Sequence, residues 1–131
     1  MKPEVQKPAS MSEAPLLMVV DDDPSVLLLV DVLAEKMGFR VKAVSSGLQA
    51  LEHLRDGLQP QVILLDIMME RIDGLTFMNH LREMPNVEST PVVAMSTAAV
   101  LDRYGEQLQV SGTLLKPFTH ATLAEALRRY R

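Results

Sequence analysis

Short apolar runs alternate with amphipathic segments along the chain from residue 16 onward. Five of the apolar runs have the length of a β-strand, and three of these carry no polar residue before their last position. The predicted strands are residues 16–20, 40–44, 62–66, 91–95 and 112–115. Strands that helices cover on both faces have this nearly continuous apolar composition, so the pattern predicts a buried sheet.

The segments that follow the strands have apolar residues at helical spacing. The predicted helices are residues 24–38, 46–57, 74–85, 97–110 and 119–131. Pro24 suits a first helical turn, and Gly38 follows the first helix. Ser45 or Ser46 can cap the second helix, and Pro85 ends the third.

This alternation predicts an α/β fold, a doubly wound (βα)5 sheet of five parallel strands joined by right-handed crossovers. Such sheets bind ligands beyond the carboxyl ends of their strands, near the point where the strand order reverses. The residues that directly follow each strand are therefore the first place to look for chemistry.

The composition suits one globular domain, expected over residues 15–131. The chain has 131 residues, of which 47% are hydrophobic and 23% are charged. Residues 1–14 are rich in Pro, Glu, Lys and Ser and offer little to bury, which predicts a disordered lead.

Charge and hydropathy exclude several classes of protein. A formal net charge of −4 does not favour direct binding to nucleic acid, which usually needs a clustered basic surface. No apolar run approaches the roughly 20 residues that span a bilayer. We therefore expect no membrane insertion, and we expect a cytoplasmic location. The absence of Cys removes disulfides, thiolate catalysis and Cys-based metal sites.

Polar residues follow four of the five predicted strands. They are Asp21, Asp22 and Asp23 after the first strand, Asp66 at the end of the third, Ser96 and Thr97 after the fourth, and Lys116 after the fifth. Clustered carboxylates repel one another unless a cation joins them, and oxygen ligands of this kind suit Mg²⁺. The lysine and a hydroxyl would then have an anion to hold, so the pattern predicts a phosphate-handling metal site.

Some of these residues have simpler roles available. Asp23 directly precedes Pro24 and is better placed as a helix cap than as a metal ligand. A hydroxyl after a strand is ordinarily a cap as well, and Thr97 competes with Ser96 for the functional role. The three His residues share no ligand spacing and are interpreted as surface or hydrogen-bonded side chains.

Four motifs, taken in order and spacing, resemble the receiver domain of two-component response regulators, of the chemotaxis-receiver type. They are VVDDDPS, VILLDIMMERIDGL, PVVAMSTA and LLKPF. The resemblance covers nearly everything from residue 16 to the end of the chain, and it implies a flavodoxin-like fold with strand order 2-1-3-4-5. It also implies a signalling module rather than a turnover enzyme, with Asp66 as the phosphoacceptor.

The resemblance assigns further roles around Asp66. Asp22 and Asp66 would bind Mg²⁺ directly, the backbone carbonyl of Met68 would be a third protein ligand, and Asp21 would act through water. Lys116 would pair with phosphoryl oxygens, with a cis peptide bond to the proline that follows it.

The resemblance also implies a switch and its partners. Ser96 would be the hydroxyl that turns toward the phosphoryl group. The expected donor is a phosphohistidine on a sensor histidine kinase or a histidine phosphotransfer protein, and the expected output is contact with a downstream protein target. Homodimerisation through the fourth helix, fifth strand and fifth helix is a further expectation.

Several positions depart from the family pattern. Thr113 stands at the switch position, three residues before Lys116, where the family usually has an aromatic residue or His. The segment from Ser96 to Lys116 is shorter than the common spacing, and Gly105 interrupts the fourth helix at a cost near 1 kcal/mol. We therefore expect that helix to be short or irregular.

Three departures fall in the loops beside Asp66. Glu70 adds a charge where the family often has Pro. Met68 and Ala98 are apolar where polar side chains can place the water that hydrolyses the acyl phosphate. This apolar pair predicts a longer-lived phosphoryl group.

Two other functions are also compatible with the sequence. DDDPS also matches the D-x-D-x-[ST] pattern of haloacid-dehalogenase-like phosphatases, with Asp21 as nucleophile, but beyond Lys116 the only acid is Glu125. A pseudo-receiver that binds protein partners without being phosphorylated is the other alternative. Its support comes from Thr113 and the shortened fourth helix region.

Overall fold

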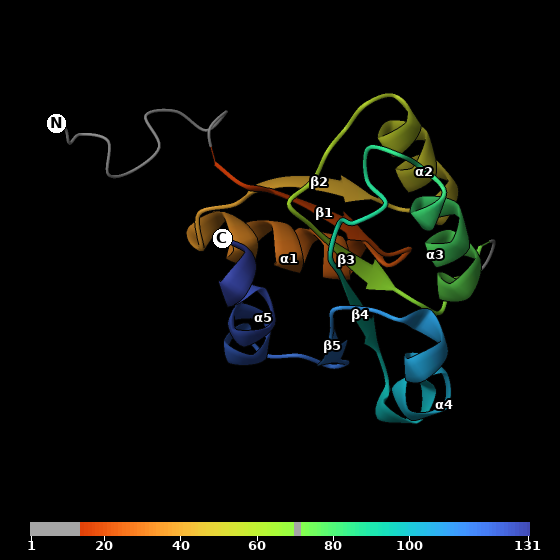
Figure 1. Cartoon of the computed structure of the whole chain (residues 1–131). Helices are drawn as coiled ribbons and strands as arrows, with labels where there is room; N and C mark the ends of the chain where they lie inside the picture. Colours follow the sequence, from red (N-terminus) through yellow and green to blue (C-terminus); the bar gives the residue numbers. More distant parts are fainter. Residues whose placement is uncertain (1–13, 70–71) are drawn as a thin grey trace, which may run out of the picture.

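The computed structural model describes residues 14–69 and 72–131, which form a five-stranded parallel sheet with helices on both faces (Figure 1). The strand order is β2-β1-β3-β4-β5, as the receiver resemblance implies. The strands are β1 (Leu16–Val20), β2 (Arg40–Val44), β3 (Val62–Asp66), β4 (Val92–Ser96) and β5 (Gly112–Leu115). The predicted α/β doubly wound fold is confirmed.

A helix follows each strand. The helices are α1 (Pro24–Lys36), α2 (Gly47–Arg55), α3 (Gly74–Arg82), α4 (Ala98–Leu108) and α5 (His120–Leu127), with a 3-10 turn at Arg128–Tyr130. Of the two candidate caps, Ser46 is the one that caps α2, its hydroxyl accepting from the Gln49 amide at 3.1 Å. No described helix has both the length and the apolar composition needed to cross a membrane.

The sheet separates two hydrophobic clusters because successive side chains of a strand point to opposite faces. On β1, Leu17 and Val19 belong to the cluster under α1 and α5, whereas Met18 and Val20 belong to the cluster under α2, α3 and α4. Figure 1 shows the same division of the helices. The three central strands are buried at every position, which is why they read as continuous apolar runs.

The prediction of a short or irregular fourth helix is wrong, because α4 is a regular helix of eleven residues. Gly105 lies inside it, and a Cβ added there would meet nothing within 4 Å. The unfavourable propensity of one glycine, about 1 kcal/mol, is evidently outweighed by burial of the apolar side of the helix, including Leu108.

The predicted disordered lead lies outside the described residues except for Ala14. Ala14 is buried, and its carbonyl accepts a hydrogen bond from Arg40 Nε at 3.0 Å. Glu70 also lies outside the described residues. The domain boundary at residue 15 and the effect of Glu70 therefore stay predictions.

Candidate functional site

The predicted site residues gather at the carboxyl edge of the sheet, beside the neighbouring strands β1 and β3, between which the strand order reverses. The pairing aligns Val20 with Leu65 and Ser96 with Leu115, so the strands end at nearly the same level. Asp66 and Ser96 are the last residues of β3 and β4, and Asp21 directly follows β1. Their side chains are thus positioned by buried strands rather than by free loops.

Three carboxylates form the acidic part of the site. Asp21, Asp22 and Asp66 each offer one carboxylate oxygen, and these oxygens lie within 4.8 Å of one another. Asp21 is fully buried and Asp66 is 5% exposed, whereas Asp22 is exposed. Three hard oxygen donors around one point, open to solvent on the side of Asp22, fit a divalent cation such as Mg²⁺.

Local hydrogen bonds fix the loop after β1. The Asp21 amide donates to the Val44 carbonyl at 3.2 Å, and the Asp23 amide donates to Asp21 Oδ1 at 2.9 Å. Asp23 itself caps α1, because its Oδ1 accepts from the Ser25 amide at 2.9 Å. The prediction that Asp23 is a helix cap is confirmed.

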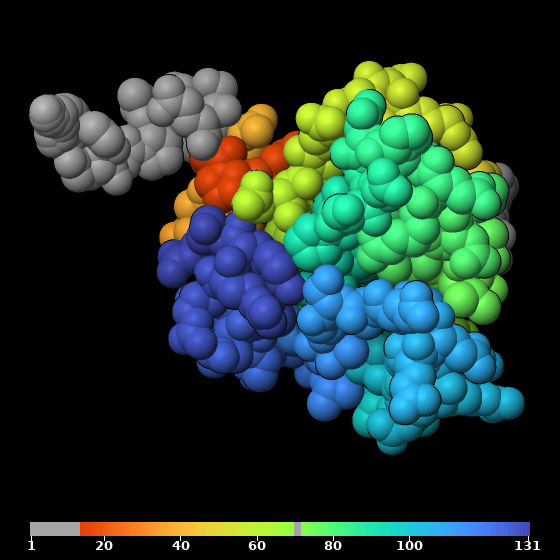
Figure 2. All heavy atoms as spheres, in the orientation of Figure 1, coloured from red at the N-terminus to blue at the C-terminus, as the bar shows by residue number. Residues whose placement is uncertain are grey.

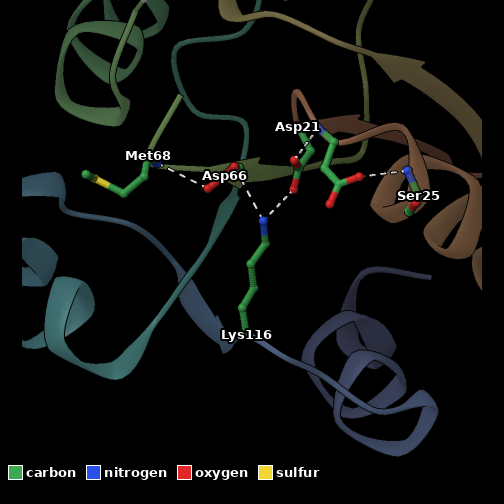
Figure 3. Close-up of polar contacts among 6 residues, drawn as sticks. Asp21, Ser25, Asp66, Met68 and Lys116 are labelled. Carbon is green, nitrogen blue, oxygen red and sulfur yellow. Dashed lines mark hydrogen bonds and ion pairs between the residues drawn. The ribbon is translucent and has the colours of Figure 1, made fainter. Parts of the chain in front are cut away.

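Lys116 reaches across the edge of the sheet to two of the carboxylates (Figure 3). Its Nζ lies 2.7 Å from Asp21 Oδ2 and 3.4 Å from Asp66 Oδ2. Its amide donates to the Ser96 carbonyl at 2.9 Å, and its peptide bond to Pro117 is cis, as predicted. The sequence placed this lysine near the acids, but its shorter contact with Asp21 was not predicted.

Burial and neighbouring charge set the protonation of the pair. Burial raises the pKa of Asp66 above its ordinary value, and the charge of Asp21 raises it further, although the Met68 amide and Lys116 oppose the shift. Burial alone would lower the pKa of Lys116, but its hydrogen bond to Asp21 and the charges of both aspartates raise it overall. Lys116 is thus held as a cation, and it lies beside Asp66, whose ionised form is disfavoured by burial.

The two hydroxyl candidates differ in position. Ser96 is 4% exposed at the end of β4, inside the edge of the sheet. Thr97 is exposed at the N-cap of α4, where its side chain makes no capping hydrogen bond. Ser96 is therefore the hydroxyl enclosed by the strand ends that carry Asp66 and Lys116.

Met68 and Thr113 are both exposed. The Met68 amide donates to Asp66 Oδ1 at 3.1 Å, and in Figure 3 its side chain points away from Lys116. Thr113 lies on β5 and alternates with Leu114, which faces α1 and α5, so Thr113 is directed to the α4 side. The hydrogen bond from the Met68 amide to Asp66 was not predicted, because any residue except proline can donate it and the sequence therefore gives no sign of it.

A close approach of helix and loop also escaped sequence reasoning. A Cβ at Gly74 would overlap the side chain of Ile67, the residue that follows Asp66, and would make a tight contact with its Cα. Glycine at the first position of α3 therefore lets this helix pack directly on the loop that carries the acid. The glycine was visible in the sequence, but the neighbour that requires it was not.

Five parallel strands in the order 2-1-3-4-5, each followed by a helix, form the fold of a response regulator receiver domain. The family model for the response regulator receiver domain matches residues 17–128, and the chain belongs to this family. Receiver domains are signalling domains of two-component systems, so the haloacid-dehalogenase alternative is not favoured. Glu125, the acid on which that alternative would depend, is exposed on α5 and pairs with Arg128 at 3.0 Å.

Curated relatives include both regulators and kinases. The chain is 38% identical over 128 residues to the probable C4-dicarboxylate response regulator DctR of Halalkalibacterium halodurans, covering 92% of this chain and 54% of that protein. It is 32% identical over 117 residues to the signal transduction histidine-protein kinase BarA of Escherichia coli, covering 88% and 13%. The chain thus spans about half of the regulator and a small part of the kinase.

Solved structures agree with the fold. The chemotaxis response regulator CheY4 of Vibrio cholerae superposes with a TM-score of 0.82 at 25% sequence identity, covering 90% of this chain and 99% of that one.

Proposed function

We propose that this domain accepts a phosphoryl group on Asp66 from a phosphohistidine of a sensor histidine kinase or histidine phosphotransfer protein. The observation that carries the proposal is the arrangement around Asp66: two further carboxylates within 4.8 Å and the Lys116 ammonium 3.4 Å from its Oδ2. Acids and a cation that converge on one point suit phosphoryl transfer, which depends on positioning and charge compensation.

The reaction can be written from the residues present. An oxygen of Asp66 attacks phosphorus, the bond between phosphorus and the donor imidazole nitrogen breaks, and an acyl phosphate forms. Lys116, which lies 3.4 Å from Asp66, and the buried Ser96 hydroxyl would compensate charge on the transferred oxygens. Mg²⁺, when bound by Asp21, Asp22, Asp66 and the Met68 carbonyl, would supply the remaining charge compensation. Later attack of water on phosphorus returns the free carboxylate.

The switch follows from the change in charge. An acyl phosphate brings close to two negative charges to the position of Asp66, which favours shorter contacts with Lys116 and Ser96. We place the output on the surface of α4, β5 and α5, where Leu115 is 54% exposed and available to a downstream protein or to a second copy of the domain. A cytoplasmic location is part of the same proposal.

Intact mass after incubation with acetyl phosphate tests the proposal most directly. We expect one phosphoryl adduct on the wild type that needs Mg²⁺, disappears with a chelator and is absent from Asp66→Asn. Asp23→Asn is the matched control, because asparagine also caps helices and Asp23 is outside the acidic cluster. It should be phosphorylated like the wild type.

Other outcomes would point to the alternatives. A folded wild type that binds Mg²⁺ but forms no adduct with acetyl phosphate or with a phosphohistidine donor would favour the pseudo-receiver, as the small Thr113 at the switch position does. An adduct that survives in Asp66→Asn and is lost in Asp21→Asn would favour the haloacid-dehalogenase-like phosphatase, with Asp21 as its nucleophile.

A further inference from the structure

A cleft of about 200 Å³ lies between α3 and α4, on the face of the sheet opposite α1 and α5. Figure 2 shows these two helices, in green and blue, side by side at the surface. The apolar lining comes from Ile67, Met68, Leu75, Val100, Tyr104 and Leu108. Only Met68 is shared with the proposed phosphorylation site.

The rim of the cleft is apolar and exposed. Met68 is 58% exposed, Leu75 is 41% exposed and Tyr104 is 38% exposed. Single exposed apolar side chains are ordinary, but three that line one concave site mark a surface that a partner can cover. A free small molecule inside the cleft would leave most of this rim in water, so the rim favours a protein as the occupant.

The volume indicates what the partner inserts. Clefts that bind drug-sized ligands usually measure about 300–1,000 Å³, so this cleft is too small for one. An apolar cavity of about 150 Å³ can hold benzene. The cleft therefore matches one aromatic ring, with Tyr104 able to contact it edge-to-face or in an offset stack.

The charges around the cleft favour a positive neighbour beside that ring. Asp73 is the only charged residue in the described lining, and the acidic cluster lies beyond Met68. Helix α4 carries Asp102 and Glu106 against one base, Arg103, whose guanidinium lies 5.5 Å from the centre of the Tyr104 ring. The described lining and helix α4 each carry a net negative formal charge, and complementary charge steers and orients partners.

We propose that the cleft between α3 and α4 binds one aromatic side chain of a partner protein, flanked in that partner by Lys or Arg. We further infer that this binding is linked to the state of Asp66, an extension that rests on the proposed function.

The link is short and physical. Met68 lines the cleft, and its amide donates to Asp66 Oδ1 at 3.1 Å. Phosphorylation changes the charge of the carboxylate that accepts from the Met68 amide, so it acts directly on the backbone of a residue that lines the cleft. In this proposal the affinity for the aromatic group changes with it, and the coupling is reciprocal.

Amide chemical shifts of the unphosphorylated protein test the binding, with the peptide Ac-Lys-Phe-Lys-NH2 as probe. We expect saturable shifts at Leu75, Val100 and Gln107, and at least tenfold weaker binding of Ac-Lys-Ala-Lys-NH2. Tyr104→Ala and Leu75→Ala, both at exposed positions, should each weaken binding of the aromatic peptide at least fivefold. Leu28→Ala is the control, because Leu28 is 67% exposed on α1, on the other side of the sheet.

Specific results would overturn the proposal. Equal binding of the two peptides, or unchanged binding in both Tyr104→Ala and Leu75→Ala, would remove the cleft as the site. Benzyl alcohol binding as tightly as the aromatic peptide would assign the cleft to a free aromatic molecule. Self-association in ultracentrifugation that Tyr104→Ala abolishes would assign it to a second copy of the chain.

The link to Asp66 has its own measurement. Peptide affinity should change at least threefold when the acyl phosphate forms with acetyl phosphate and Mg²⁺, and should not respond to these reagents in Asp66→Asn. Equal affinities with the adduct confirmed by mass would overturn the link. If no adduct forms, the proposed function and the link both fail, while the peptide and variant data on unphosphorylated protein still decide the cleft.

Discussion

Asp66 lies where its ionisation is unfavourable, although the proposed function needs the ionised carboxylate as nucleophile. Burial is the main reason, and the charge of Asp21 adds to it. Lys116 compensates only in part, because its closer contact is with Asp21 at 2.7 Å rather than with Asp66 at 3.4 Å. The metal-free domain therefore holds excess negative charge that a cation or a proton can relieve.

Replacing Asp66 by Asn should stabilise the metal-free domain at neutral pH. The folded-state pKa of Asp66 is raised above the ordinary 3.8, so the native state holds the proton more tightly and the wild type loses stability as pH rises through that pKa. We expect Tm of Asp66→Asn to exceed that of the wild type by a few degrees at pH 7 in EDTA. The difference should shrink as pH falls toward 3.8. A variant less stable than the wild type at pH 7 would show that the ion pair with Lys116 outweighs burial.

Met68 should lengthen the life of the acyl phosphate, because its exposed thioether side chain cannot hold a water molecule in line with phosphorus. We expect Met68→Asn to hydrolyse faster, on the order of tenfold, which corresponds to about 1.4 kcal/mol in the barrier. Decay of the adduct, followed by intact mass after removal of acetyl phosphate, measures the rate. Met68→Leu keeps the position apolar and should decay like the wild type. Equal lifetimes for all three proteins would contradict this role.

At the scale of elements, α4 is the helix with the weakest local support. Gly105 lies in its interior, Thr97 provides no side-chain cap, and Gln109 closes it with φ of 54°, in the left-handed region that glycine adopts most readily. Its regular geometry therefore depends on packing, and local opening of α4 should cost less than opening of the capped helix α3.

Gly105→Ala should stabilise the domain by about 1 kcal/mol, because alanine is the better helix former and the added Cβ has free space. Gly74→Ala is the informative contrast, since the same chemical change would overlap Ile67 and should destabilise by roughly 1–3 kcal/mol. Urea denaturation of the three proteins gives both values. Destabilisation by Gly105→Ala would mean that α4 needs the flexibility of glycine at this position.

The helices and strands could be predicted because the spacing of apolar residues along the sequence matches the positions that are buried in the fold. β1, β3 and β4 are buried on both faces and appear as continuous apolar runs, and helix signals such as Pro24 and Ser46 lie at the observed starts. The prediction of a short or irregular α4 was wrong because it rested on the low helix propensity of Gly105 and took no account of the packing that outweighs this propensity. Local preference cannot report a contact that only the folded chain makes.

At the scale of the whole molecule, parallel order and aligned strand ends bring residues that are far apart in sequence to one edge. This rule was enough to predict that Asp21, Asp66, Ser96 and Lys116 lie together, because it needs only the ends of strands. It could not predict which acid Lys116 contacts more closely, or that Met68 joins Asp66 to the cleft between α3 and α4. Those features depend on side-chain and loop geometry at the ångström scale.

Mg²⁺ should shift the folding equilibrium of the whole domain, since the three carboxylates converge only in the folded chain. A ligand that binds only the native state adds about 2.7 kcal/mol at a concentration 100 times its Kd. We expect Tm of the wild type to rise with Mg²⁺ at pH 7 and not with equal ionic strength of NaCl.

Neighbouring substitutions separate this site from general charge screening. Asp22→Asn removes an exposed carboxylate of the cluster, so it should change stability in EDTA by no more than about 0.5 kcal/mol but weaken the Mg²⁺ response at least tenfold in concentration. Asp23→Asn changes the same charge one residue further on, keeps a capping side chain at α1, and should leave the response within twofold of wild type. Equal loss in both variants would mean that Mg²⁺ acts on the negative surface as a whole rather than on the three converging oxygens.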